Sequence, residues 1–109
     1  MSITVENIFA EVPKSSGQEQ FLTLFKSESV KIQRIVSKGY SSPPDFWYDQ
    51  AEDEWVIVLR GDATLEFEGG ELVRMKEGDH VTIPRHVRHR VQQTSAETIW
   101  LAVHVPDQR

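Results

Sequence analysis

The sequence predicts an all-β protein, a sandwich or barrel built from short strands. Two observations support this prediction: apolar and polar residues alternate in several short runs, and glycines separate those runs. The clearest alternating run covers residues 63–68, between the turn sequences Gly61–Asp62 and Gly69–Gly70. Short strands at regular spacing with turns of this kind are typical of sandwiches and barrels.

The length, charge and composition exclude several classes of protein. At 109 residues the chain has the length of one domain, which buries roughly two-thirds of its unfolded surface without needing disulfides. The net charge is -5 and the acidic residues are spread out, whereas a nucleic-acid-binding domain normally carries a basic patch. No apolar run approaches the length of a membrane span. We therefore expect neither nucleic acid nor membrane as a partner.

The chain has no cysteine, and its first ten residues lack the basic and apolar regions of a signal peptide. A cysteine-free chain is compatible with a reducing compartment. We therefore expect a cytoplasmic protein.

The N-terminal segment is predicted to form an extended arm or short strand over residues 3–9, ended by Pro13, and then one short helix. Ser16 and Glu19 have the spacing of a capping box, and the next apolar residues follow at helical spacing. We expect the helix over residues 17–27. Its apolar residues are Phe21, Leu22, Leu24 and Phe25.

Strands are expected wherever β-branched or alternating residues lie between turns. Residues 38–45 contain one glycine, two serines and two prolines, so they form a loop rather than a strand. The predicted strands cover residues 30–37, 54–59, 63–68, 71–75, 81–83, 88–93 and 98–105.

Two short motifs lie between Glu54 and His89. In the first, Gly61 follows Glu54 by seven residues; in the second, Pro84 follows Gly78 by six and His89 comes five residues later. Both spacings resemble the two motifs of the cupin superfamily.

The resemblance covers roughly residues 30–105 and implies a small single-domain cupin, whose fold is a double-stranded β-helix, or jelly-roll barrel. Residues 1–29 would then be the N-terminal arm and the short helix. On this reading, residues 1–109 form a single cupin domain.

In metal-binding cupins the first motif supplies two histidines and a glutamate, the second supplies one histidine, and all four point into the barrel. By resemblance, Glu54 and His89 match two of these ligands. The other two positions hold no histidine, and the family allows two spacings for them. They fall on Trp47 and Asp49, or on Tyr48 and Gln50.

The first spacing would bring together Asp49, Glu54 and His89 as the metal ligands. Two carboxylates and one neutral imidazole suit a divalent ion such as Mn, Fe, Zn or Ni. The other histidines, His80 and His104, are expected to be structural or surface residues. The remaining residues expected to shape the pocket are Trp47, Tyr48, Gln50, His86 and Gln93.

The resemblance implies a pocket for a small organic molecule and leaves two functions open. One is a divalent-metal-dependent enzyme of the dioxygenase or isomerase type, which the retained Glu54 and His89 favour. The other is a non-catalytic binding or sensing domain without metal, which the loss of both histidines of the first motif favours. Nothing supports nucleophilic catalysis, because the chain has no cysteine and no serine in a nucleophile elbow.

We also expect a homodimer. Trp55, Ile57 and Leu59 lie on the strand face opposite Glu54, and a short chain has few elements left to cover them. The arm of residues 3–9 could pair with an exposed sheet edge of the partner and protect that edge.

Overall fold

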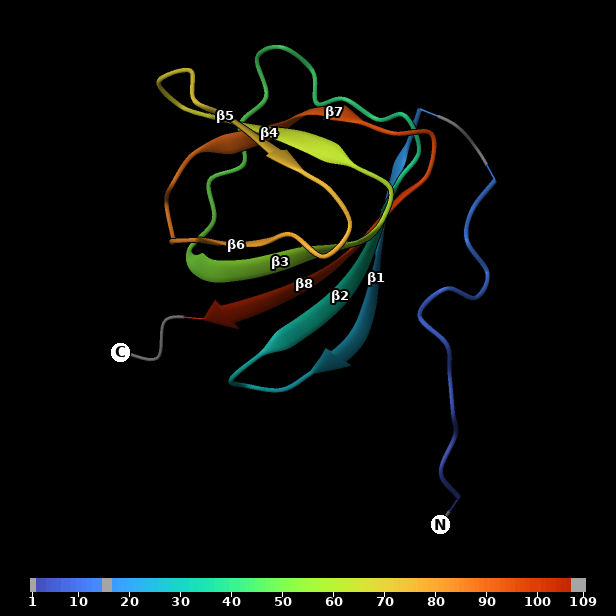
Figure 1. Cartoon of the computed structure of the whole chain (residues 1–109). Helices are drawn as coiled ribbons and strands as arrows, with labels where there is room; N and C mark the ends of the chain where they lie inside the picture. The colour runs from blue at the N-terminus through green and yellow to red at the C-terminus, as the bar shows by residue number, and fades with distance from the viewer. Residues whose placement is uncertain (1, 15–16, 107–109) are drawn as a thin grey trace.

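The computed structural model describes residues 2–14 and 17–106, and all regular structure within these ranges is β-strand (Figure 1). The strands form two antiparallel sheets, ordered β1-β2-β8-β3-β6 and β5-β4-β7. This confirms the all-β prediction, and two facing sheets fit the jelly roll. The strands are β1 (Glu19–Lys26), β2 (Lys31–Ser37), β3 (Glu52–Arg60), β4 (Ala63–Phe67), β5 (Leu72–Met75), β6 (His80–Ile83), β7 (His89–Thr94) and β8 (Thr98–Pro106).

Each strand predicted from residue 30 onward is present, and no end differs from the prediction by more than two residues. The hairpin between β4 and β5 turns at Gly69 and Gly70, which have φ values of 104° and 100°. Only glycine adopts such angles without strain, which explains the glycine pair at this turn.

The predicted helix over residues 17–27 is wrong, because this stretch forms the edge strand β1. Glu19 lies opposite Ser37 at the start of the pairing between β1 and β2. Ser16, the predicted helix cap, lies outside the described residues.

A β-bulge explains why β1 has the apolar spacing of a helix. The register with β2 shifts between Thr23 and Phe25, so one extra residue interrupts the alternation of side chains. Phe21 faces the space between the sheets, whereas Leu22 and Phe25 pair with residues on the opposite face. Without the bulge, strict alternation would have been visible in the sequence.

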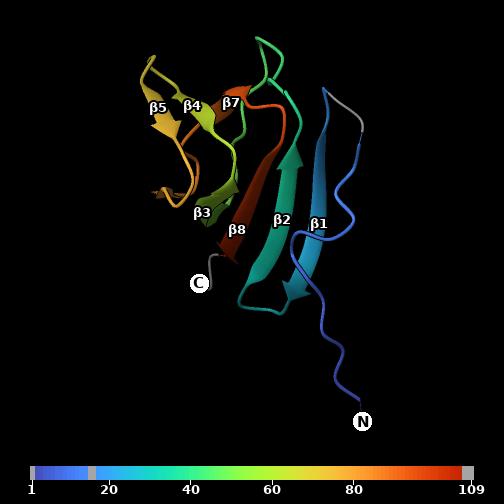
Figure 2. The ribbon, with the colours of Figure 1, turned by 45° about the vertical axis from the view of Figure 1, so that its right-hand side comes forward.

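The core lies between the two sheets, which appear as facing layers in Figure 2. β1 and β2 lie at the side of the larger sheet that is remote from β5. Phe21 is 49% exposed there although it faces inward, so the core is less covered at this end. The buried core residues are Ile35, Val56, Val58, Ala63, Leu65, Met75, Ile83, Val91, Trp100 and Ala102.

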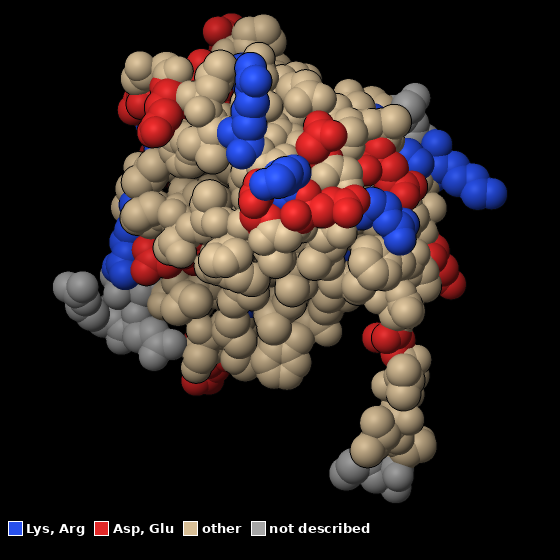
Figure 3. All heavy atoms as spheres, viewed as in Figure 1, with Lys and Arg blue, Asp and Glu red and all other residues tan. Residues whose placement is uncertain are grey.

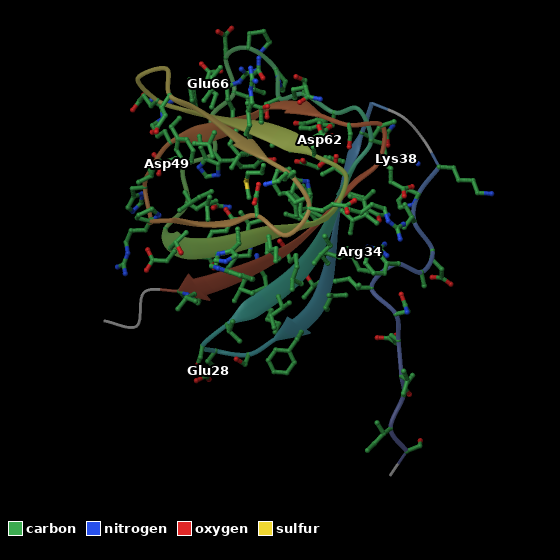
Figure 4. The ribbon with its side chains drawn as sticks, in the orientation of Figure 1. Glu28, Arg34, Lys38, Asp49, Asp62 and Glu66 are labelled. Atoms are coloured by element: carbon green, nitrogen blue, oxygen red, sulfur yellow. The ribbon has the colours of Figure 1, made fainter. Side chains whose placement is uncertain are left out.

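The N-terminal arm contacts the larger sheet around residues 8–10. The buried guanidinium of Arg34 donates hydrogen bonds to the carbonyls of Ile8 and Ala10, at 3.2 and 2.6 Å, and Figure 4 shows this side chain beside the arm. Further out, the arm stands clear of the body (Figures 1 and 3), and Ile3 and Val5 are 88% and 92% exposed. No helix in the described part of the chain is long and apolar enough to span a membrane.

Candidate functional site

A cavity of about 100 Å³ lies between the two sheets. Its wall is mainly apolar, and several ionisable groups converge on it, which is the usual composition of a small-molecule site. The apolar lining includes Phe21, Ile35, Leu65, Val91 and Trp100, and the polar lining consists of Glu19, Lys31, Gln33, Tyr48, Gln50, Glu54, His89 and His104.

Three buried ionisable side chains meet at Glu54. Glu54, His89 and His104 are only 7%, 5% and 3% exposed. The Nε2 atom of His89 lies 3.8 Å from one carboxylate oxygen of Glu54, and the Nε2 atom of His104 lies 3.8 Å from the other. Strand pairing creates this arrangement, because Glu54 of β3 lies directly opposite His104 of β8 and paired residues share one face of a sheet.

The hydrogen bonds of His89 fix which of its nitrogens faces the cavity. Its Nδ1 lies 2.9 Å from the carbonyl of Val87, and a carbonyl can only accept, so Nδ1–H is the donor. Its Nε2 then carries a lone pair and faces Glu54 at 3.8 Å, beyond hydrogen-bond length.

His104 is buried between two carboxylates without a hydrogen bond. Its Nδ1 lies 3.8 Å from Glu52, its Nε2 lies 3.8 Å from Glu54, and neither nitrogen has a hydrogen-bond partner among the described residues. Buried polar atoms in folded proteins are normally paired. An unpaired imidazole at this depth therefore points to a further group that binds beside it.

Burial shifts the protonation of all three groups toward their neutral forms. It raises the pKa of Glu54 to about 7, and the nearby charges of Glu52 and Glu19 add to this effect. It lowers the pKa of both His89 and His104. At neutral pH the two imidazoles therefore present lone pairs, and Glu54 is readily protonated.

A second polar chain forms another part of the cavity wall. Tyr48 Oη and Ser37 Oγ each donate a hydrogen bond of 2.8 Å to the carboxylate of Glu19, and Trp100 Nε1 donates one of 3.1 Å to Ser37 Oγ. Burial raises the pKa of Glu19, and it also raises that of Tyr48, so this phenol keeps its proton.

The structure distinguishes the two spacings of the first motif. Tyr48 and His89 exchange backbone hydrogen bonds of 2.7 and 3.1 Å, and their rings stack with centroids 5.5 Å apart. Tyr48 and Gln50 therefore line the cavity together with Glu54 and His89. The intervening Asp49 points outward (Figure 4).

Four of the predicted site residues lie outside this cavity. Asp49 contacts His86 Nδ1 at 2.8 Å on the surface, so the structure does not bring it to Glu54 and His89. The guanidinium carbon of Arg88 lies over the ring of Trp47, 5.8 Å from the ring centroid. His86 and Asp49 are both exposed.

Gln93, the fourth, is exposed because of a bulge in β7. The register with β4 shifts where Thr64 pairs with Gln93 and Leu65 pairs with Val91. The extra residue turns Gln93 away from the inward face that Val91 occupies.

His104 was not among the residues predicted for the site. Its signal was the alternation along residues 98–105, which places His104 on the same face as Trp100 and Ala102. The register that brings it opposite Glu54 joins strands far apart in the sequence, and no local pattern encodes that register.

The donor set fits a divalent ion in composition. Two neutral imidazoles and one carboxylate are the protein ligands of many iron sites, and imidazole also suits zinc and nickel. In residues 2–14 and 17–106, however, no group of three or more His, Asp and Glu side chains is already arranged as a metal site.

The distances leave room for a metal ion. Two ligands at about 2.0–2.2 Å from one ion lie at most about 4.4 Å apart, when they are on opposite sides of it, and closer in any other geometry. Each imidazole of His89 and His104 lies 3.8 Å from Glu54. The three side chains therefore need a small movement to hold an ion together.

The profile of the cupin-domain family matches residues 33–104. The chain belongs to this family. A cupin of known structure from Desulfitobacterium hafniense is 18% identical, with a TM-score of 0.75 over 88% of this chain and 84% of that chain, and it supports the fold alone.

Two proteins with higher sequence identity to this cupin have names that state an activity. A structure from Ralstonia eutropha, provisionally named as a mannose-6-phosphate isomerase, is 44% identical, with a TM-score of 0.89 over 96% of this cupin and 100% of that chain. The 3-hydroxyanthranilate 3,4-dioxygenase of Ruegeria pomeroyi is 33% identical over 79 residues, which are 70% of this cupin and 43% of the dioxygenase. This chain thus spans less than half of the dioxygenase.

Proposed function

We propose that this cupin is a divalent-metal-dependent enzyme that acts on a small organic molecule in the cavity. One observation carries the proposal: two imidazole nitrogens face the two oxygens of Glu54, each at 3.8 Å. Glu54, His89 and His104 would hold the ion, and Asp49 has no part in the set. A bound ion of this kind supplies Lewis-acid chemistry by polarising an oxygen of the substrate.

The residues around the three donors have separate tasks in this proposal. Gln50 offers an amide to the substrate from the cavity wall. The protonated phenol of Tyr48 is held by Glu19, so it forms a fixed part of the wall. The apolar lining excludes water from the reacting groups, which strengthens every electrostatic contact inside.

The similar proteins support an enzyme of the isomerase or dioxygenase type. Their names refer to mannose 6-phosphate and 3-hydroxyanthranilate, and both are small anionic molecules. We accordingly expect a small organic substrate.

Metal binding is tested by thermal unfolding of the chelator-treated protein with and without Mn, Fe(II), Zn and Ni. One of these ions should raise the stability by about 2.7 kcal/mol at 100 times its dissociation constant. His89→Ala or His104→Ala should abolish the rise, because each deletes one of two inward nitrogens, whereas Trp47→Phe should keep it. If none of the four ions raises the midpoint of the wild type, the proposal fails.

A second candidate is a metal-free binding domain, which the absence of a formed metal group among the described residues favours. The lone pairs of His89 and His104 would then accept hydrogen bonds from a ligand. A ligand whose affinity is the same with and without chelator would support this function over the first.

A further inference from the structure

We propose that the molecule bound in the cavity carries an anionic group and that Lys31 binds this group. The inference rests on the proposed function, because Lys31 lines the same cavity as the three proposed metal ligands. Lys31 belongs to the lining, and it is the one lysine or arginine there among the residues that the structure describes.

Strand pairing places Lys31 beside the three donors. Lys31 of β2 lies opposite His104 of β8, which in turn lies opposite Glu54 of β3. These residues form one row across the inward face of the larger sheet, and the Cβ atoms of directly opposed residues are only about 4.5–5.5 Å apart.

The ammonium group of Lys31 has no counter-charge in contact with it. Within residues 2–14 and 17–106 it makes no hydrogen bond and no ion pair. Its charge nevertheless reaches the site, since it opposes the rise in the pKa of Glu54 and adds to the lowering of the pKa of His104. An anion bound at this end of the cavity would give the ammonium group of Lys31 a partner of opposite charge.

The remaining lining limits the ligand. Along β2, the inward residues change from Lys31 to Gln33 and then to the buried Ile35, so polarity falls with depth. An apolar cavity of about 150 Å³ holds one benzene ring, and this cavity measures about 100 Å³. The chemical class is therefore a short-chain or small-ring carboxylate or phosphate ester.

The test measures binding of matched probes by calorimetry, with and without metal: butyrate against butyramide, and inorganic phosphate. We expect wild type to bind butyrate at least tenfold more tightly than butyramide. Lys31→Met should remove this preference and leave metal binding unchanged. Lys26→Met, which removes the same charge from the residue opposite Lys31 on β1 but outside the lining, should keep the preference.

Equal affinities for butyrate and butyramide in wild type would overturn the inference, as would a preference that survives Lys31→Met. So would the absence of binding by both anions. The proposed function fails separately, if no metal ion raises the unfolding midpoint. The preference for butyrate over butyramide can still be measured then, because that measurement is also made in chelator.

A different observation leads to a second inference. The face of the larger sheet that points away from the cavity carries a continuous apolar row over four strands. Phe25 at its edge is 54% exposed, and the other members are half-buried. The row consists of Phe25, Ile32, Val103 and Trp55.

We infer that this outer row packs against the same row of a second copy of the chain. An apolar row is self-complementary across a two-fold axis, as a symmetric dimer requires. The arm supplies an independent reason, because its own-subunit contacts cover residues 8–10, whereas Ile3 and Val5 lie almost fully exposed beyond them. A partner subunit beside the sheet gives these two side chains a surface to cover.

Light scattering at micromolar concentration tests the dimer. Wild type should have twice the mass of the chain, and Trp55→Glu or Val103→Glu should reduce it to the monomer mass. Leu72→Glu is the control, because Leu72 is 50% exposed, close to the 54% of Phe25 in the outer row, but lies on the smaller sheet. A monomeric wild type, or a dimer that Leu72→Glu dissociates as readily as Trp55→Glu, would overturn the inference.

Discussion

Each of the two imidazoles at the candidate site has its Nδ1 atom directed away from the cavity. In His89 this atom meets the carbonyl of Val87 at 2.9 Å, and in His104 it faces Glu52 at 3.8 Å. An outer partner of this kind holds the proton on Nδ1 and leaves the Nε2 lone pair for a ligand. At 3.8 Å Glu52 is not hydrogen-bonded to His104 in the metal-free protein. We expect the small movement that brings the three donors onto an ion to bring Glu52 within hydrogen-bond reach of His104 Nδ1.

Glu52→Gln should weaken metal binding by about tenfold or more, the usual effect of losing an outer partner of a ligating histidine. A competition titration against a chelator measures it. Asp49→Asn makes the same chemical change at a carboxylate bound to His86 on the surface, and it should leave the affinity unchanged. Equal losses in both variants would contradict the assigned role of Glu52.

The raised pKa of Glu54 makes the stability of the metal-free protein depend on pH. As pH rises from 4.5 to about 7, the unfolded chain releases a proton that folded Glu54 keeps, so stability falls. His89 and His104 act in the opposite direction, because their lowered pKa values cost stability only as pH falls below 6.5.

Glu54→Gln removes only the first of these effects. The free energy of unfolding of Glu54→Gln minus that of wild type should therefore increase from pH 5 to pH 8, by up to roughly 3 kcal/mol. Urea unfolding in the presence of chelator at several pH values measures this difference. A difference that stays constant over this range would show that Glu54 titrates normally.

At the scale of the elements, local patterns were informative where strands alternate without interruption. Alternation correctly predicted the strands from residue 30 onward and the inward direction of Glu54. It misled at two bulges: the one in β1 imitated helical spacing, and the one in β7 turned Gln93 outward. Bulges follow from pairing with another strand, and a single segment does not reveal them.

Gly61, in the turn between β3 and β4, has a φ of 83°, and an added Cβ would meet the Glu97 carbonyl and the Ser95 hydroxyl. Gly61→Ala should cost roughly 2–5 kcal/mol, from the left-handed conformation together with the steric overlap. Gly78→Ala is the control, since Gly78 has a φ of 90° but open space around it, and it should cost only about 1–2 kcal/mol. Urea unfolding compares them; equal costs would contradict the steric explanation.

At the scale of the whole molecule, the larger sheet separates the cavity from the proposed dimer face. If two chains share the outer row, folding and association are coupled, and the unfolding midpoint should rise with protein concentration. Calorimetric scans over a hundredfold range of concentration measure this. Trp55→Glu should give a midpoint independent of concentration, and a concentration-independent wild type would contradict the coupling.

The seven-residue strand β2 divides its side chains between two environments. Residues 31, 33 and 35 line the cavity, whereas Arg34 of the opposite face holds the N-terminal arm. Substitutions at these three positions therefore alter the cavity wall, whereas a substitution at Arg34 alters the surface that holds the arm. A laboratory library restricted to positions 31, 33 and 35 would explore new specificities while leaving the outer surface of this scaffold as it is.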